Sequence, residues 1–169
     1  MAFVSLAIRL IVLIVLLWLA VFDVRSRRLP TKMTLMIGVL FFLDALIIRM
    51  PVHDLLTHLL LGLAVFMICA ALFAAKMLGG GDAKLAAVIF LWVGLRLAIP
   101  ALTLVSVIGT LVSLVSLATR KMNSVQRSTP LRTLALFSGA RGVPYGVALA
   151  LGGGTVIVLP ALLPFIFKR

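Results

Sequence analysis

Long apolar runs dominate this chain and restrict the folds that it can adopt. The first run covers residues 2–22 with Arg9 as its single charge, and the others cover residues 33–48, 55–75, 82–98, 100–118 and 143–167. A helix needs about 20 residues to cross the roughly 30 Å core of a bilayer, so runs of this size are typical of membrane spans. The sequence therefore predicts an all-α polytopic membrane protein with six transmembrane helices, forming a single membrane-embedded domain over residues 1–169.

The composition supports this fold class and excludes others. Hydrophobic residues make up 64% of the chain and charged residues 12%, about half of the usual share for a soluble domain. A disordered chain needs low hydrophobicity and high charge, and a soluble domain needs more polar side chains to cover its surface. A signal peptide is the alternative for the first run, but no basic cluster precedes it and no small-x-small cleavage site follows it. We interpret it as a retained helix in which Arg9 reaches toward the nearer interface.

The basic residues predict how the chain is oriented. Eleven of the 16 Lys and Arg residues follow the first, third and fifth predicted spans. Because cytoplasmic loops carry the excess of positive charge, residues 23–32, 76–84 and 119–142 are predicted to be cytoplasmic loops, with both termini on the non-cytoplasmic side. Orientation and attraction to anionic membrane lipid also account for the net charge of +12, so no nucleic acid partner is expected.

The four acidic residues are the main candidates for chemistry. In this topology Asp23 and Asp82 lie at the cytoplasmic membrane edge, whereas Asp44 lies within the second span and Asp54 in an outer loop. Asp23 alone is equally explained as a boundary acid balanced by nearby arginines, and Asp82 as a helix N-cap. Together, two carboxylates at one depth can share a proton, so that one acts as general base and the other as general acid in peptide hydrolysis.

Other reactive groups offer weaker sites. The two histidines, His53 and His58, are expected to be interfacial residues rather than metal ligands, and the single Cys69 to be a packing residue rather than a nucleophile. No metal and no cofactor are therefore expected. Three glycines, 79–81, precede Asp82, and they suit either a flexible turn or the close approach of another backbone such as an extended substrate strand.

Two segments around the acids resemble known motifs. Residues 23–31, DVRSRRLPT, resemble the Asp-x5-Ile-Pro-Asn signature of bacterial prepilin peptidases (type IV leader peptidases), with Pro30 matching and Leu29 and Thr31 as mild departures. Residues 79–85, GGGDAKL, resemble the Gly-x-Gly-Asp motif of the same family and its following lysine, here Lys84.

A third segment resembles the short members of that family, which serve Flp-type (tight adherence) pili. Residues 143–150, VPYGVALA, are similar to the Pro-Tyr-Gly-x-Ala motif that opens the last helix of those members. The matching residues are Pro144, Tyr145 and Gly146. The three motifs occur in the family's order, and the six-span layout covers essentially the whole chain.

The resemblance implies an intramembrane aspartic endopeptidase of the bacterial inner membrane. It implies that Asp23 and Asp82 are catalytic, with Gly79, Gly80, Gly81 and the other matching residues in support. The implied substrate is a prepilin with a short basic leader, cleaved at the cytoplasmic membrane face. The four-cysteine region of long members is missing, so S-adenosylmethionine is not assigned as a cofactor.

Two other functions stay open at this stage. An intramembrane acid such as Asp44 also occurs in small ion or solute transporters. A non-catalytic membrane subunit of a pilus or secretion platform would use the basic loop 119–142 to bind a partner or anionic lipid. The oligomeric state is not predicted.

Overall fold

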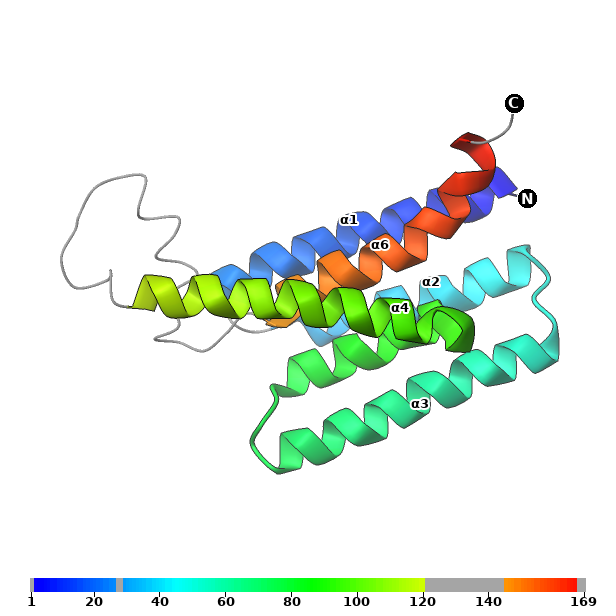
Figure 1. Ribbon diagram of the computed structural model, residues 1–169. Coiled ribbons are helices and arrows are strands. Elements are labelled where there is room, and N and C mark those ends of the chain that lie inside the picture. The colour runs from blue at the N-terminus through cyan, green and yellow to red at the C-terminus, as the bar shows by residue number, and fades with distance from the viewer. Residues whose placement is uncertain (1, 27–28, 121–144, 167–169) are drawn as a thin grey trace.

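The chain forms a bundle of helices, as Figure 1 shows. The computed structural model describes residues 2–26, 29–120 and 145–166. In this part of the chain the helices are α1 (Ala2–Ser26), α2 (Thr31–Ile47), α3 (Val52–Ala74), α4 (Gly80–Arg120) and α6 (Tyr145–Ile166). The predicted all-helical class is confirmed for these residues, and the beginning of α1 lies beside the end of α6 (Figure 1).

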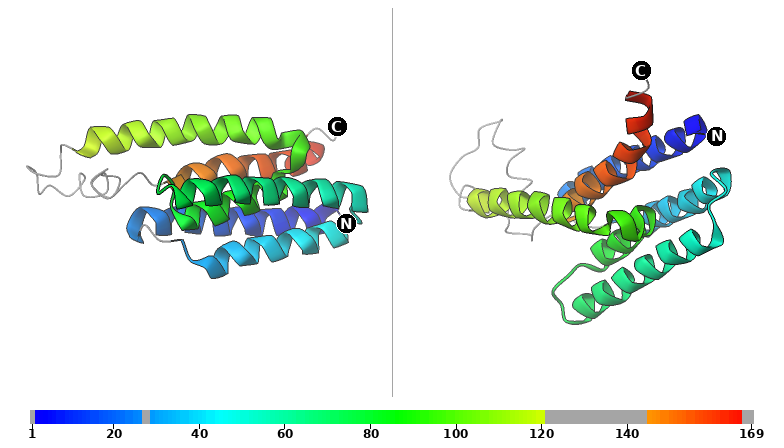
Figure 2. Two further views of the ribbon diagram at one scale, coloured as in Figure 1. Left: turned by 90° about the horizontal axis from the view of Figure 1, so that it is seen from below. Right: turned by 45° about the vertical axis from the view of Figure 1, so that its right-hand side comes forward.

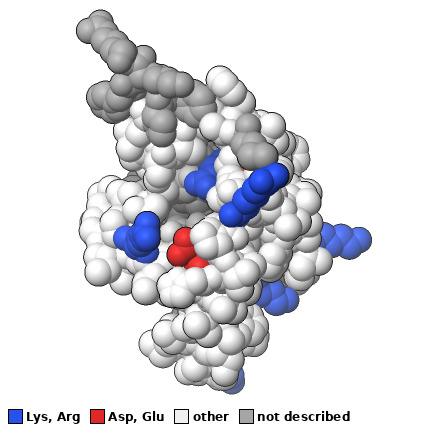
Figure 3. All heavy atoms as spheres, turned by 90° about the vertical axis from the view of Figure 1, so that its right-hand side faces the viewer, with Lys and Arg blue, Asp and Glu red and all other residues white. Residues whose placement is uncertain are grey.

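Most of these helices are suited to a bilayer. Ala2–Ser26, Val52–Ala74 and Tyr145–Leu163 are long and apolar enough to cross one, and so is Gly80–Ala118 when it is taken over its whole length, whereas α2 has only 17 residues. Large apolar side chains such as Phe3, Leu46 and Ile99 are more than 70% exposed, which suits contact with lipid rather than water. Seen from the end where α1 begins, most of the surface is neither acidic nor basic (Figure 3). The protein is therefore a multi-pass membrane protein.

The long helix α4 is broken within its length. Gly94 has φ 66° and ψ 173°, which separates a first part, residues 80–93, from a second part, residues 95–120. The second part runs back in the opposite direction, as the views in Figure 2 show. The sequence placed this break just before Pro100, and that position is wrong. The break requires a positive φ that only glycine adopts without a steric penalty, whereas Pro100 is accommodated inside the helix.

Helix α6 is the centre of the bundle and packs against α1 and both parts of α4. Its glycine triplet, residues 152–154, makes this close packing possible. A Cβ atom at Gly152 would lie 2.9 Å from the backbone nitrogen of Val105, and Gly153 lies tightly against Ile89. The largest fully buried apolar side chains come from α1, α2, α4 and α6: Val12, Leu16, Leu19, Ile37, Leu85, Ile89 and Ile157.

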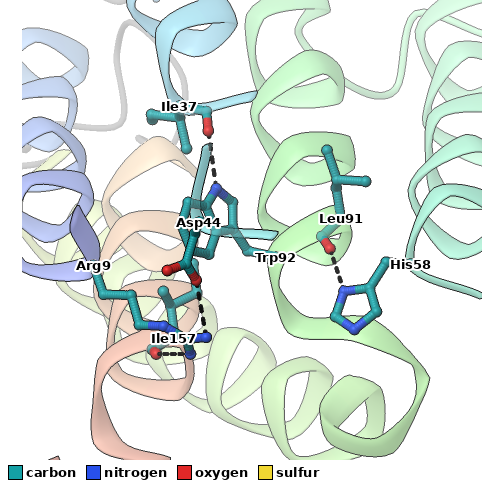
Figure 4. Close-up of polar contacts among 7 residues, drawn as sticks. All are labelled: Arg9, Ile37, Asp44, His58, Leu91, Trp92 and Ile157. Carbon is teal, nitrogen blue, oxygen red and sulfur yellow. Dashed lines mark hydrogen bonds and ion pairs between the residues drawn. The ribbon is translucent and has the colours of Figure 1, made fainter. Parts of the chain in front are cut away.

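An ion pair joins α1 to α2 inside the bundle. A guanidinium nitrogen of Arg9 lies 3.0 Å from Oδ2 of Asp44, and its Nη1 donates a hydrogen bond to the carbonyl oxygen of Ile157 at 3.2 Å (Figure 4). The Asp44 side chain is only 3% exposed. The expectation that Arg9 reaches toward the interface is therefore wrong, because a buried acid provides a partner within reach. This ion pair explains why an acid is buried at position 44, so Asp44 gives no support to a path for transported ions.

His58 braces the break in α4. Its Nδ1–H donates to the carbonyl oxygen of Leu91 at 2.8 Å (Figure 4), and its ring stacks on Phe41 with 5.5 Å between the ring centroids. The same ring fills the space beside Gly94. An interfacial position for His58 is therefore wrong, whereas His53 is exposed, with its Nδ1 3.6 Å from a carboxylate oxygen of Asp54.

Candidate active site

Asp23 lies near the end of α1 and is buried, with 5% of its surface exposed. Its Oδ2 accepts a hydrogen bond of 2.9 Å from the backbone N–H of Gly146. This N–H belongs to the first turn of α6, where backbone donors have no partner within the helix and where the helix dipole favours negative charge. Helix α6 therefore supplies the stabilisation that a carboxylate lacks at the carboxyl end of its own helix.

Gly146 allows this contact because it has no side chain. A Cβ atom there would lie 2.8 Å from Oδ2 of Asp23 and 2.9 Å from its Cγ, distances too short for a side chain to tolerate. The preceding residue, Tyr145, is exposed, and Pro144 lies outside the described residues. Gly146 of the Pro-Tyr-Gly motif is thus tied to Asp23, a residue 123 positions away in the sequence.

Asp82 lies in the first turn of α4. The helix begins at Gly80, and the N–H of Ala83 donates to the carbonyl oxygen of Gly79 at 3.0 Å. Asp82 is thus the third residue of the helix, and the alternative that it is the N-cap is wrong. Oδ2 of Asp82 folds back toward Gly79, where a Cβ atom would approach it to 2.8 Å.

The three glycines before Asp82 each lie against a different side chain of the protein. Gly79 contacts Asp82, Gly80 contacts Phe73, and Gly81 contacts Leu29. The last contact is tight, because a Cβ atom at Gly81 would lie 2.9 Å from Cβ of Leu29. Gly81 therefore lets the segment that follows Asp23 pack against the helix that carries Asp82.

A polar contact joins the same two segments. Nζ of Lys84 donates to Oγ1 of Thr31 at 3.4 Å, on the exposed surface. Pro30 directly precedes α2 in an extended conformation, with φ −65° and ψ 117°, and its carbonyl oxygen accepts from the N–H of Met33 at 3.1 Å. The first two motif segments are thus neighbours in space.

A half-open groove leads away from Asp82. It encloses about 870 Å³ between α3, both parts of α4 and α6, and both Asp82 and Tyr145 belong to its lining. Most of its other lining residues are apolar, and Cys69 is among them. We call this the α3–α4–α6 groove.

The groove is the part of the site that the sequence did not reveal. Its most regular wall is formed by small side chains at helical spacing on the second part of α4: Ser106, Gly109, Thr110 and Ser113. Such a row of small residues in an apolar span is a signal for close helix packing. It was hidden among the Leu, Val and Ile residues of the same run.

A known family also matches the chain. A model of the type IV leader peptidase family matches residues 10–114, well over half of the chain. The chain belongs to the type IV leader peptidase family. It is therefore a peptidase that acts on prepilins, and it is embedded in a membrane. Neither a curated protein nor a solved structure matches the chain.

The family match covers both acidic motifs but ends before α6. Asp23 and Asp82 fall inside the matched residues, whereas Tyr145 and Gly146 lie beyond them. What connects α6 to the site is therefore the structure, through the Gly146 contact with Asp23 and the shared lining of Tyr145 and Asp82.

Proposed function

We propose that this protein is an aspartic endopeptidase of the bacterial inner membrane that removes the short basic leader of Flp-type prepilins at the cytoplasmic face. In this proposal Asp23 and Asp82 are the catalytic pair. One observation supports it: Gly146, in the first turn of α6, binds Asp23, and Tyr145 of the same turn lines the groove whose lining also includes Asp82. The first turn of α6 is therefore bound to one acid and borders the same groove as the other.

The surroundings of the two acids suggest their roles. Asp23 accepts a backbone N–H at a helix N-terminus, which suits a carboxylate that takes a proton from water. Asp82 borders an apolar groove, which suits a carboxyl group that holds the shared proton. Water then attacks the carbonyl carbon of the scissile peptide while its proton passes to Asp23. The C–N bond breaks as Asp82 gives its proton to the leaving amine.

The test is co-expression with a prepilin and substitution of each acid by its amide. Asp23→Asn and Asp82→Asn keep the side-chain shape but remove proton transfer, so each is expected to lower the processing rate by about 10²- to 10⁴-fold. Asp54→Asn is the matched control, because Asp54 is exposed beside His53 and away from the site. Asp44 is a poor control, since its loss leaves Arg9 without its partner.

Two measurements separate catalysis from folding. Thermal unfolding in detergent is expected to be similar for Asp54→Asn, Asp82→Asn and the unchanged protein. Processing is followed by mass spectrometry of the pilin N-terminus, which also gives the cut site. Wild-type processing by either Asp23→Asn or Asp82→Asn would refute the catalytic pair.

A further inference from the structure

One guanidinium group connects four helices of the bundle. Arg9 on α1 lies with its Cζ atom 5.8 Å from the ring centroid of Trp92 on α4, within the range of a cation–π contact. The same guanidinium group binds Asp44 on α2 and the carbonyl oxygen of Ile157 on α6. Arg9 is therefore held by three helices other than its own.

Trp92 is a fixed partner for this group. It is only 5% exposed, and its Nε1–H donates to the carbonyl oxygen of Ile37 at 2.9 Å (Figure 4). The ring of Phe41 packs edge-on against it, with 5.6 Å between the ring centroids. Because α2 holds the indole ring at two points, the ring gives Arg9 a defined position relative to α4.

The ion pair is not arranged for the strongest binding between its two members. A side-on pair would join two guanidinium nitrogens to the two carboxylate oxygens. Here one nitrogen binds Oδ2 of Asp44 at 3.0 Å, whereas Nε of Arg9 and Oδ1 of Asp44 are buried without a hydrogen-bond partner among the described residues. The guanidinium group reaches Ile157 and Trp92 instead. This orientation favours a role in holding the other helices over a role in neutralising two charges.

The contact of Arg9 with Trp92 joins the two helices that carry the acids. Asp23 lies further along α1, and Asp82 lies earlier in the first part of α4. Within the described residues, α1 packs mainly against α2 and α6, and α4 packs mainly against α2, α3 and α6. A direct link between α1 and α4 therefore matters for how the two acids lie relative to each other.

Arg9 and Asp23 lie on opposite sides of the point where α1 contacts the glycine triplet of α6. That point is Leu13, because a Cβ atom at Gly154 would lie 2.8 Å from its side chain. From Leu13 to Asp23 the helix extends about 15 Å at 1.5 Å per residue. A tilt of α1 by about 5° at Leu13 would therefore move Asp23 by about 1 Å, a displacement that can lower a reaction rate about 10²-fold.

We propose that Arg9 is a positioning residue of the peptidase. By binding α2, α4 and α6 at once, its guanidinium group fixes the tilt of α1 and with it the separation of Asp23 and Asp82. This deepens the proposed function and rests on it. A lysine would neutralise Asp44 but would not replace this group, because an ammonium lacks the planar fork that stacks on a ring while it binds two acceptors.

Two variants separate this role from the stability of the bundle. Arg9→Lys keeps a positive charge opposite Asp44, and Arg9→Leu/Asp44→Leu removes both charges, so neither leaves a buried carboxylate without a partner. Arg96→Leu is the matched control, because Arg96 is exposed and lies beyond the break at Gly94. Thermal unfolding in detergent shows which variants fold like the unchanged protein, and Arg9→Lys carries the test if the double variant is unstable.

The readout is kcat and KM for a prepilin over a range of pH. For Arg9→Lys and the double variant, kcat is expected to fall about 10- to 100-fold with KM little changed. The pH range of processing is also expected to narrow, because two carboxylates keep a shared proton over a wider pH range the closer they lie. A smaller amount of folded protein would lower the rate equally at every pH and leave this range unchanged.

The outcomes distinguish the two proposals. An unchanged kcat, or a lower kcat with an unchanged pH range, would overturn the inference and leave Arg9 with a structural role. If Asp23→Asn or Asp82→Asn still processes the prepilin, the catalytic pair is refuted and the positioning role fails with it. If both acid variants are inactive and Arg9→Lys behaves like Arg96→Leu, the catalytic pair stands and the positioning role is refuted.

Discussion

The contact between Gly146 and Asp23 can be tested by adding a single methyl group. In Gly146→Ala the new Cβ would lie 2.8 Å from Oδ2, 2.9 Å from Cγ and 3.1 Å from Cβ of Asp23. Carbon atoms pack at about 3.5–4.0 Å, so each of these distances is too short. Rotation of the carboxylate alone does not relieve the contact, because it also involves the Cβ atom of Asp23. Helix α6 and the end of α1 must therefore move apart.

The size of the effect follows from the hydrogen bond that is lost. Moving the two helices apart until the new Cβ atom reaches an ordinary contact distance would lengthen this 2.9 Å hydrogen bond by several tenths of an ångström. The bond would then leave the hydrogen-bonding range. A hydrogen bond to a charged group contributes about 1.5–3 kcal/mol. If this stabilisation is fully used in the transition state, its loss lowers the processing rate about 10- to 150-fold.

The assay is a time course of prepilin processing in membranes that contain equal amounts of each variant. Gly38→Ala is the control, because a Cβ atom at Gly38 meets nothing within 4 Å. Alanine also favours a helix over glycine, so this control is expected to keep both stability and activity. If Gly146→Ala processes the prepilin as fast as Gly38→Ala, the contact with Asp23 has no part in catalysis.

Two further predictions concern the fold. Gly94→Ala places a side chain at a positive φ and against the ring of His58, so it is expected to lower the free energy of unfolding by at least about 1–3 kcal/mol. Thermal unfolding in detergent measures this loss. An unchanged midpoint would contradict the bracing role of His58. Arg9→Leu is expected to destabilise the bundle by about 3 kcal/mol, because Asp44 is left buried without its partner, and the double variant Arg9→Leu/Asp44→Leu is expected to recover most of the loss. A double variant as unstable as Arg9→Leu would show that the ion pair is not the cause.

Much of the architecture is readable from local patterns. Apolar runs of span length predict the helices, and the polar segments between them predict where Asp23 and Asp82 lie relative to helix ends. These are properties of consecutive residues. The break in α4 is different, because Pro100 is the stronger local signal, but the break occurs at Gly94, where the ring of His58 from another helix fills the space that a side chain would need.

The site is likewise predictable only in part, because contacts between distant segments shape it. The acids and the glycines stand out in the sequence, but their partners come from distant segments. Gly146 meets Asp23 across 123 positions, and Gly81 meets Leu29 across the second and third helices. Local patterns carry no information on which helices become neighbours, so the groove and the role of α6 required the structure.

The Arg9–Asp44 ion pair has a consequence for how the protein is made. During synthesis Arg9 leaves the ribosome 35 residues before Asp44. An arginine at the centre of an inserting helix costs about 2.5–3.5 kcal/mol. Arg9 is the eighth of the 25 residues of α1, so its cost is lower, but α1 alone has no acid in its amino-terminal half to offset it. Insertion of α1 and α2 as a hairpin lets the two charges enter the bilayer as a pair. Asp44 would then offset the cost of Arg9, and the nascent chain would be held more stably in the membrane once the second helix has joined the first.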